Sequence, residues 1–330
     1  MSMEVVACPT CLIALQAGDE QYVCPRCRRV YGCTLGIPSL CPPAVMMAPI
    51  ERELIQRLCA MYPTATVEEL TRARLAALVT SEDRLPHYAH YFGSMVERGH
   101  RFYQMFRERL RQQGWTNDRH QLALDVGCGS GSGLLALARD YDHVVGVEIS
   151  LSALIIAKKA IENAGLTNVT LVHGSAHQMP LLDGAFDLAI SINVLEHVFT
   201  PAVMLRDVRR TLTVSGTFCG ESRNRFDVFF PEPHVGLRWV GFLPRRYMAR
   251  YVRWRKGLEY QSVYLLSYGD LSQALHDAFG REWRIVLPDI TVYGFPVWAR
   301  SIVERLWALA PLRWLMVRLS PSQLTLARRV

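Results

Sequence analysis

Hydrophobic and polar positions alternate regularly from residue 119 onward, as short apolar runs separated by helical patterns. Each apolar run has the length of a strand buried on both faces, and the intervening segments repeat apolar residues at the spacing of an amphipathic helix. Because the connections are short, the pattern predicts a doubly wound, mostly parallel α/β sheet. The predicted strands are 122–126, 143–147, 168–173, 186–192 and 215–220, with helices at 132–140, 151–164 and 200–212.

The same reading divides the chain into four parts. The segment 221–267 is too long for an ordinary connection, so we interpret it as an insertion in the core. Segments 51–80 and 88–113 have helical spacing and precede the core. The parts are a cysteine-bearing segment with its linker (1–43), a helical lead-in (44–118), the core with its insertion (119–297) and amphipathic C-terminal helices (298–330).

A glycine-rich loop follows the first core strand. The run Leu124 to Gly131 reads LDVGCGSG, and Glu148 closes the second strand. Alternate glycines allow a sharp turn against a ligand, and the later acid suits two ribose hydroxyls, so the pair predicts a nucleoside cofactor. Ser132 fits the dinucleotide fingerprint poorly, and a carboxylate at Asp125 disfavours a diphosphate. S-adenosylmethionine, which presents an ammonium and a sulfonium, suits this carboxylate better.

With these residues the chain resembles the class I S-adenosylmethionine-dependent methyltransferases, whose fold is Rossmann-like. The resemblance extends through the Gly174 to Leu181 run GSAHQMPL, the strand beginning Phe186-Asp187, and Leu195-Glu196-His197. It is similar to the branch that contains quinone-biosynthesis enzymes. Ser175 stands where that branch usually has an acid, so the adenine-amine contact can fall to the backbone, His177 or Gln178. The resemblance implies a cofactor site of Asp125, Gly127, Cys128, Gly129, Gly131, Glu148, Ile149, Ser175, Ala176 and Asn193.

The resemblance also implies roles for the parts around the core. A helix at 269–279 and strands near 283–289 and 291–296 would complete an antiparallel edge, and the insertion would shape the acceptor site. The lead-in would cover the cofactor. Its apolar side chains either line a pocket or, more commonly for such a stripe, pack on the sheet. They are Tyr88, Tyr91, Phe92, Met95, Phe102, Tyr103 and Phe106.

Two Cys-x-x-Cys pairs near the N-terminus predict a metal site. Cys8 and Cys11 are followed, after twelve intervening residues, by Cys24 and Cys27. Four thiolates at this spacing suit tetrahedral Zn²⁺, and so short a segment has too little core to fold without a metal. The segment resembles the zinc-ribbon module of methyltransferase activator subunits, which serves structure or docking. We therefore expect the ribbon to be separate from the cofactor site, and Cys33 and Cys41 to be spare thiols.

Composition and charge narrow the partners. Nine cysteines without a leader pattern or a bilayer-length apolar run predict a cytoplasmic protein, with metal-bound or buried thiols rather than disulfides. The formal net charge is +7, and from Glu221 onward 17 Lys and Arg stand against 9 Asp and Glu. Nearly all of these cations are Arg, which suits planar contacts with phosphate or carboxylate, so an anionic partner is expected for the C-terminal half.

Two histidines are candidates for a general base. Methyl transfer from a sulfonium is an in-line displacement, and a hydroxyl acceptor usually needs a base, whereas carbon or soft nitrogen acceptors need little help. His197 opens the helix after the fourth strand, and it either acts as the base or lines the donor pocket. His234 lies in the proline-bounded run Pro231 to Leu237. His87, His90, His100 and His177 have no assigned role.

The segment Arg245 to Lys256 holds six cations and three aromatic residues without an acid. This mixture suits single-stranded RNA or the headgroup zone of a membrane. Residues 297–319 carry Trp and Arg at helical spacing, which favours a membrane periphery, although burial within the protein is the commoner outcome. We therefore predict methyl transfer to a small-molecule or amphipathic, lipid- or glycan-linked acceptor. The alternatives are an RNA base methyltransferase that uses the ribbon to bind RNA, and a non-catalytic scaffold.

Overall fold

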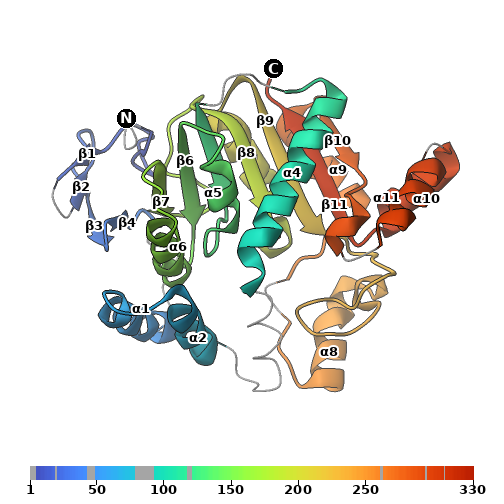
Figure 1. Ribbon diagram of the computed structural model, residues 1–330, viewed down its shortest axis with the longest axis horizontal. Coiled ribbons are helices and arrows are strands. Elements are labelled where there is room, and N and C mark those ends of the chain that lie inside the picture. The colour runs from blue at the N-terminus through green and yellow to red at the C-terminus, as the bar shows by residue number, and fades with distance from the viewer. Residues whose placement is uncertain are drawn as a thin grey trace.

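The computed structural model describes residues 5–18, 21–42, 49–78, 93–116, 121–260, 263–293, 296–307 and 309–330. Its centre is a seven-stranded sheet in the order β10-β11-β9-β8-β5-β6-β7 (Figure 1). Strands β5 to β9 run parallel, and β11 is antiparallel to both of its neighbours. The predicted doubly wound, mostly parallel sheet is confirmed. The strands are β5 (Leu122–Val126), β6 (His143–Glu148), β7 (Val169–His173), β8 (Phe186–Ile192), β9 (Leu212–Arg223), β10 (Trp283–Val286) and β11 (Ser322–Arg328).

Helices cover both faces of the sheet because its strands are apolar on both sides. One face packs against α4 (Met95–Gln113), α5 (Ser132–Leu137) and α6 (Leu151–Asn163), and α1 (Pro49–Met61) and α2 (Val67–Leu78) pack in turn on α6. The other packs against α7 (Pro201–Thr211) and α9 (Tyr268–Phe279). Figure 1 shows α4 and α5 in front of the sheet and α9 behind it. Phe102, Tyr103 and Phe106 of α4 are almost fully buried, and Met95 and Phe102 also line the pocket at the carboxyl ends of the strands, so the stripe serves both packing and the pocket.

The lead-in differs from the prediction in one respect. Segment 51–80 forms two helices, because Thr66 begins a new one: its hydroxyl accepts from the Glu69 backbone N–H at 3.2 Å, and its own N–H donates to the Glu69 carboxylate at 2.8 Å. Such a capping box satisfies two free N–H groups and so stabilises the start of a helix. The expected helix at 88–113 begins at Met95, and Tyr88, Tyr91, Phe92, His87 and His90 lie outside the described residues.

The C-terminal part departs most from the prediction. The expected strand at 291–296 is wrong, because Ile290–Tyr293 form a short 3-10 helix, η4. The amphipathic helices predicted for 298–330 are α10 (Val297–Trp307) and α11 (Ala310–Leu319), after which β11 enters the sheet between β9 and β10. Leu324 and Leu326 alternate with polar residues and are completely buried. Alternation of this kind is a strand signal, and the open edge of β9 provides the pairing partner.

The insertion after β9 has a small core of its own. It contains η3 (Val240–Phe242) and α8 (Arg245–Lys256), and it returns to the sheet edge where Asn224 bridges to Leu266. Six buried side chains hold it together: Val235, Leu237, Val240, Met248, Val252 and Tyr260. The insertion is therefore a separate packed unit beside the carboxyl ends of the parallel strands.

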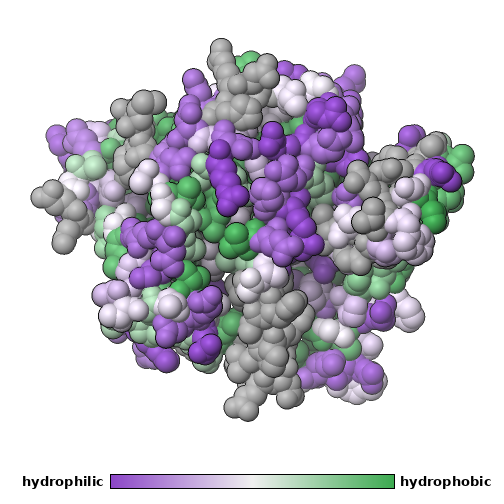
Figure 2. All heavy atoms as spheres, in the orientation of Figure 1, coloured by the Kyte–Doolittle hydropathy of each residue, from purple (hydrophilic) through white to green (hydrophobic). Residues whose placement is uncertain are grey.

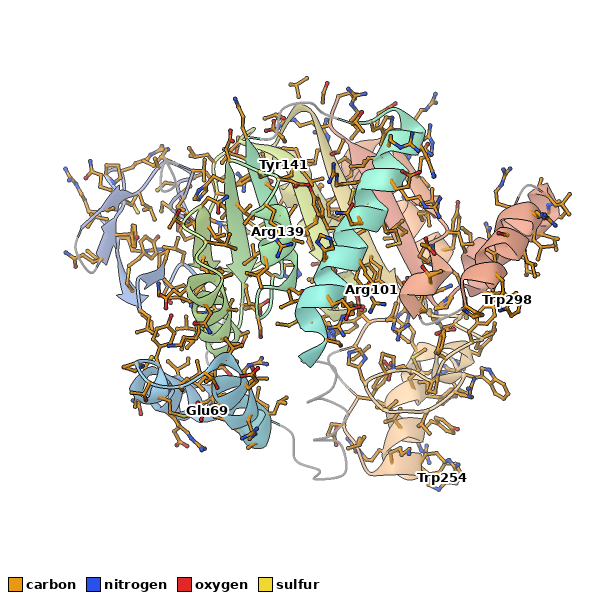
Figure 3. The ribbon with its side chains drawn as sticks, viewed as in Figure 1. Glu69, Arg101, Arg139, Tyr141, Trp254 and Trp298 are labelled. Carbon is orange, nitrogen blue, oxygen red and sulfur yellow. The ribbon has the colours of Figure 1, made fainter. Side chains whose placement is uncertain are left out.

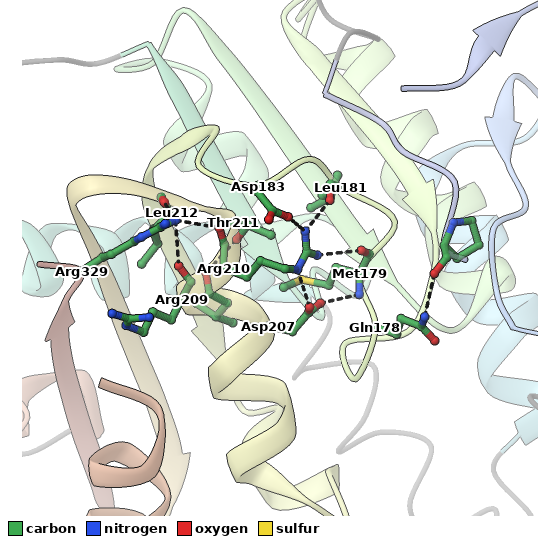
Figure 4. A network of polar contacts seen from close by, with 12 residues as sticks. Gln178, Met179, Leu181, Asp183, Asp207, Arg209, Arg210, Thr211, Leu212 and Arg329 are labelled. Atoms are coloured by element: carbon green, nitrogen blue, oxygen red, sulfur yellow. Dashed lines mark hydrogen bonds and ion pairs between the residues drawn. The ribbon is translucent and has the colours of Figure 1, made fainter. Parts of the chain in front are cut away.

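The N-terminal ribbon is fixed to the core rather than separate from it. Its strands are β1 (Gln16–Ala17), β2 (Gln21–Val23), β3 (Val30–Thr34) and β4 (Ile37–Pro38), and each pairs antiparallel with the next. The Leu40 N–H donates to the His173 carbonyl at 2.8 Å, and Gln178 donates to the Pro9 carbonyl at 2.6 Å (Figure 4). The ribbon thus packs on β7 and on the loop after it, while none of its described residues lines the pocket that holds the cofactor candidates.

Candidate active site

The glycine loop turns as its sequence predicts. Gly127, Gly129 and Gly131 have φ of 72°, 52° and 96°, in the left-handed region that side chains with a Cβ rarely adopt. A Cβ at Gly127 would lie 2.4 Å from Cγ2 of Val194, so glycine is also required by space. The loop therefore lies against the residues that follow β8, and it forms the floor of a pocket.

The pocket has a volume of about 460 Å³ and opens at the carboxyl ends of β5, β6, β7 and β8. A volume of this size is typical of small-ligand sites. It brings together nine of the residues expected to bind cofactor or act in catalysis. They are Gly127, Cys128, Gly129, Glu148, Ile149, Ser175, Ala176, Asn193 and His197. Sequence positions 127 to 197 thus converge on one cavity, as the predicted topology requires.

Glu148 has the geometry expected of a ribose-binding carboxylate. Its Oε2 accepts from the Gly129 N–H at 3.0 Å, and its Oε1 accepts from the Ser150 N–H at 2.8 Å. Burial raises the pKa of Glu148, and these two hydrogen bonds oppose that rise. Each carboxylate oxygen keeps a further lone pair for a ligand hydroxyl. The donor set of the pocket therefore suits a nucleoside.

Asp125 and Gly131 do not line the pocket. Asp125 is buried beneath the glycine loop, where Gly133 leaves room for its carboxylate: a Cβ there would lie 2.3 Å from Oδ2. Burial and the nearby Glu148 raise the pKa of Asp125 to about 7, against a hydrogen bond from the Leu134 N–H. In this structure Asp125 connects the loop to the start of α5.

Sequence reasoning missed two charged residues of the pocket. Arg74 of α2 and Arg98 of α4 both line the cavity, and Arg74 donates to the Ser152 hydroxyl at 3.0 Å. The positive charge of Arg74 opposes the rise that burial causes in the pKa of Glu148. Nothing in the local sequence singles out these arginines from the others on the polar faces of the lead-in. Of the two alternatives to Ser175, His177 lines the pocket, whereas Gln178 is held by Pro9 of the ribbon.

The structure brings together the two candidate bases. The rings of His197 and His234 meet edge to face with centroids 4.9 Å apart. His234 Nδ1 pairs closely with the Glu232 carboxylate, whose other oxygen accepts from the Val235 N–H at 2.9 Å. Only His197 lines the pocket, so the dyad of Glu232 and His234 approaches it from the insertion.

A buried acid pair lies behind the histidines. Glu196 and Glu221 are each 1% exposed, and an oxygen of each (Oε2) has no hydrogen-bond partner among the described residues. Burial and the neighbouring Glu221 raise the pKa of Glu196 to about 7. The Tyr293 hydroxyl donates to Glu221 Oε1 at 3.0 Å. Glu196 belongs to the Leu-Glu-His motif of the sequence, but Glu221 and Tyr293 carry no signal there.

Comparison with known proteins identifies the central region. Residues 124–220 match the family described as Methyltransferase domain. This chain contains an S-adenosylmethionine-dependent methyltransferase domain. The Ubiquinone biosynthesis O-methyltransferase of Maricaulis maris is 35% identical over 124 residues, which are 37% of this chain and 48% of that protein. The Ajmaline N-methyltransferase of Rauvolfia serpentina is 38% identical over 96 residues, or 28% of this chain and 33% of that one. The chain therefore spans half or less of these relatives.

Solved structures are also similar to the methyltransferase domain and its surroundings. The YcgJ protein of Bacillus subtilis has 18% identity and a TM-score of 0.43, and the match covers 67% of this chain and 96% of that one. An S-adenosylmethionine dependent methyltransferase from Mesorhizobium loti has 20% identity and a TM-score of 0.43, and the match covers 66% of this chain and 96% of that one.

Within the described ranges, no helix is both long and apolar enough to cross a membrane.

The four cysteines of the ribbon lie close together beside the methyltransferase domain. The Sγ atoms of Cys8, Cys11, Cys24 and Cys27 lie within 4.8 Å of one another, and those of Cys8 and Cys27 are 3.8 Å apart. Four sulfurs at about 2.3 Å from a tetrahedral Zn²⁺ are about 3.8 Å from each other. The cluster therefore suits a structural zinc ion, and Cys33 and Cys41 are not part of it.

Proposed function

We propose that the chain transfers a methyl group from S-adenosylmethionine to a hydroxyl of a small-molecule or amphipathic acceptor. The observation that carries this proposal is the pocket in the methyltransferase domain, where the glycine loop and Glu148 meet His197. The bound cofactor supplies an electrophilic methyl group on a sulfonium. The alternatives, an RNA base methyltransferase and a non-catalytic scaffold, lack a comparable observation.

The chain's own residues divide the work of binding. Glu148 would accept the two ribose hydroxyls, and Ser175 and Ala176, with His177 beside them, would lie along the adenine. Ile149 is half exposed at the rim and offers an apolar surface to the base. Gly127, Cys128, Gly129 and Asn193 would line the methionine end. Asp125 would act from beneath, through the position of the loop, and Gly131 through the turn itself.

The histidines support a hydroxyl acceptor. A hydroxyl is a weak nucleophile until its proton is removed, so a base within reach accelerates its attack. Glu232 would orient the imidazole of His234 through Nδ1, and the adjacent rings of His234 and His197 would take the proton of the acceptor. Once these histidines hold the proton, the acceptor oxygen would be nucleophilic enough for the methyl group that the cofactor supplies. The printed name of the Maricaulis relative, an O-methyltransferase, agrees with this direction.

The ribbon would hold one Zn²⁺ through Cys8, Cys11, Cys24 and Cys27. Its proposed role is structural, because four thiolates leave the ion no open position for a substrate. The metal would fix the ribbon against the loop that carries Ser175 and Ala176. The hydrogen bonds from Ala7 N–H to the Pro180 carbonyl, at 2.8 Å, and from Gln178 to Pro9 make this connection.

The test is transfer of labelled methyl from S-adenosylmethionine into cell extracts. The purified chain is incubated with a lipid extract, a polar small-molecule extract and total RNA, and base-stable and base-labile products are separated. Label in the lipid or small-molecule fraction that depends on Glu148 supports the proposal. Label in RNA alone supports the RNA alternative, and cofactor binding without transfer to any fraction supports the scaffold.

A further inference from the structure

Helix α8 exposes a face on which aromatic and cationic side chains alternate. Only Met248 and Val252 of this helix are buried, and they attach it to the small core of the insertion. The opposite face presents Trp254, which is 76% exposed, and Tyr247, which is 46% exposed. A helix residue of this size usually buries more of its surface, so this arrangement needs an explanation. Figure 3 shows Trp254 at the end of α8 that is farthest from the sheet.

The charge on α8 is one-sided. The helix holds five Arg, one Lys and no acid. Arg245 pairs with Asp270 at 2.8 Å, and Arg253 pairs with Glu259 at 2.7 Å. The other four cations, Arg246, Arg250, Arg255 and Lys256, have no ion pair within the part of the chain that is described. A cluster of unpaired cations is complementary to an anionic surface.

The pair α10–α11 exposes apolar side chains next to this unit. Trp298 and Trp314 are 68% and 59% exposed, and Ile302, Leu309 and Leu315 are each more than 40% exposed. Figure 2 shows hydrophobic residues gathered at the outer end of α10–α11, while hydrophilic ones predominate over α8. The two parts are joined at their base, because the Asn224 side chain donates to the Arg318 carbonyl at 2.8 Å.

We propose that α8 and α10–α11 together form a docking surface for an anionic lipid bilayer. The docking surface is defined by Arg246, Tyr247, Arg250, Trp254, Trp298, Ile302, Leu309, Trp314 and Leu315. Arginines attract anionic headgroups, and tryptophans and tyrosines lie at the boundary between headgroups and acyl chains. The aliphatic side chains of this surface, Ile302, Leu309 and Leu315, favour a bilayer over RNA. A bilayer buries such side chains, whereas the base faces of RNA stack better on aromatic rings.

The position of the docking surface links it to catalysis. The insertion that carries α8 also carries Glu232 and His234, and His234 contacts His197 at the pocket. A bilayer that holds α8 would therefore hold the entrance of the acceptor site near its headgroups. An acceptor that resides in lipid could then reach the pocket without crossing water. This consequence rests on the proposed function, whereas the docking surface itself does not.

The test is co-sedimentation of the full zinc-loaded chain with two kinds of vesicle. One contains phosphatidylglycerol and phosphatidylcholine in equal parts, and the other contains phosphatidylcholine alone. We expect binding to the anionic vesicles to fall at least about tenfold in Arg246→Ala with Arg250→Ala, because each basic residue near an anionic surface strengthens binding severalfold. The matched control, Arg139→Ala with Arg281→Ala, removes the same charge from exposed positions outside α8 and should bind like the parent.

A salt titration separates lipid from RNA. Raising the salt should remove the part of vesicle binding due to the arginines and leave a remainder, and Trp254→Ala with Trp314→Ala should abolish that remainder. Binding of a short single-stranded RNA should decline linearly in log salt without a remainder.

Three results would overturn the inference: no binding of the parent to anionic vesicles at low salt, equal loss in the control variant, or tight binding of RNA alone. A parent that binds S-adenosylmethionine but no vesicle contradicts only this inference. A parent that binds vesicles but no S-adenosylmethionine contradicts only the proposed function. Circular dichroism of each variant shows whether its fold is intact, and a variant that unfolds is replaced by Arg250→Gln alone.

Discussion

Replacing Glu148 with alanine should weaken the binding of S-adenosylmethionine strongly. The carboxylate is positioned by the N–H groups of Gly129 and Ser150 at 3.0 and 2.8 Å, so both of its oxygens face the pocket in a fixed orientation. Two hydrogen bonds to a charged group contribute about 2–4 kcal/mol in all, which corresponds to a loss of roughly 30-fold to 1,000-fold in affinity. Isothermal titration calorimetry with S-adenosylmethionine and with S-adenosylhomocysteine measures this loss.

Two further variants separate binding from loop structure. Glu53→Ala removes an exposed acid from α1 and should bind like the parent. Glu148→Gln keeps the length of the side chain but loses the charge, and should lie between the parent and the alanine variant. Because Glu148 also accepts from the glycine loop, thermal unfolding of each cofactor-free variant is recorded beside the titration. A dissociation constant for Glu148→Ala within threefold of the parent would refute the ribose role of this residue.

Three other changes test the rest of the site. The double variant Cys24→Ser with Cys27→Ser should lose the zinc ion and weaken cofactor binding, because the ribbon holds the loop of Ser175 and Ala176. Metal analysis that still finds one zinc per chain would contradict this prediction. The matched control is Cys33→Ser with Cys41→Ser. Glu232→Gln should lower kcat about 100-fold, as expected for loss of general base catalysis, and should leave cofactor affinity unchanged. Glu232→Asp should partly restore kcat. A pH–rate profile of Glu232→Gln that equals that of the parent would argue against the dyad. The pKa of Asp125 is about 7 in the folded chain and near 4 in the unfolded chain, so the folded state binds more protons between these values. The free energy of unfolding should therefore fall as pH rises from about 4 to 7. Denaturant titrations of Asp125→Asn should show a smaller fall than the parent, and equal slopes would exclude Asp125 as the source.

The central sheet could be predicted because its signals are local. Buried parallel strands appear as apolar runs, and the glycines at 127, 129 and 131 need positive φ, so both features can be read along the chain. The pocket residues between 127 and 197 followed from the topology, since the carboxyl ends of parallel strands share one edge. Two Cys-x-x-Cys pairs likewise predicted the cluster of four cysteines directly.

Features that depend on distant partners could not be predicted. β11 carries a short alternating pattern, but it follows two helices and pairs with a strand about a hundred residues earlier, and the sequence does not show that the edge of β9 is open to it. Arg74, Glu221 and Tyr293 reach the site from separate elements and have no motif around them. The packing of the ribbon on the core could not be predicted, because nothing along the chain indicates that Pro9 meets Gln178. His234 was proposed from its proline-bounded loop, but its partner Glu232 becomes apparent only in three dimensions.

The most direct test of the central claim is a single competition titration of the purified chain. Labelled S-adenosylmethionine is bound to the protein, and increasing amounts of unlabelled S-adenosylhomocysteine or NAD are then added over the same range of concentrations. The account predicts one binding site per chain, full displacement by S-adenosylhomocysteine and none by NAD, because the pocket presents Glu148 and the glycine loop above a buried Asp125. Tighter binding of NAD than of S-adenosylmethionine, or no saturable site for either, would contradict the assignment of this pocket to methyl transfer.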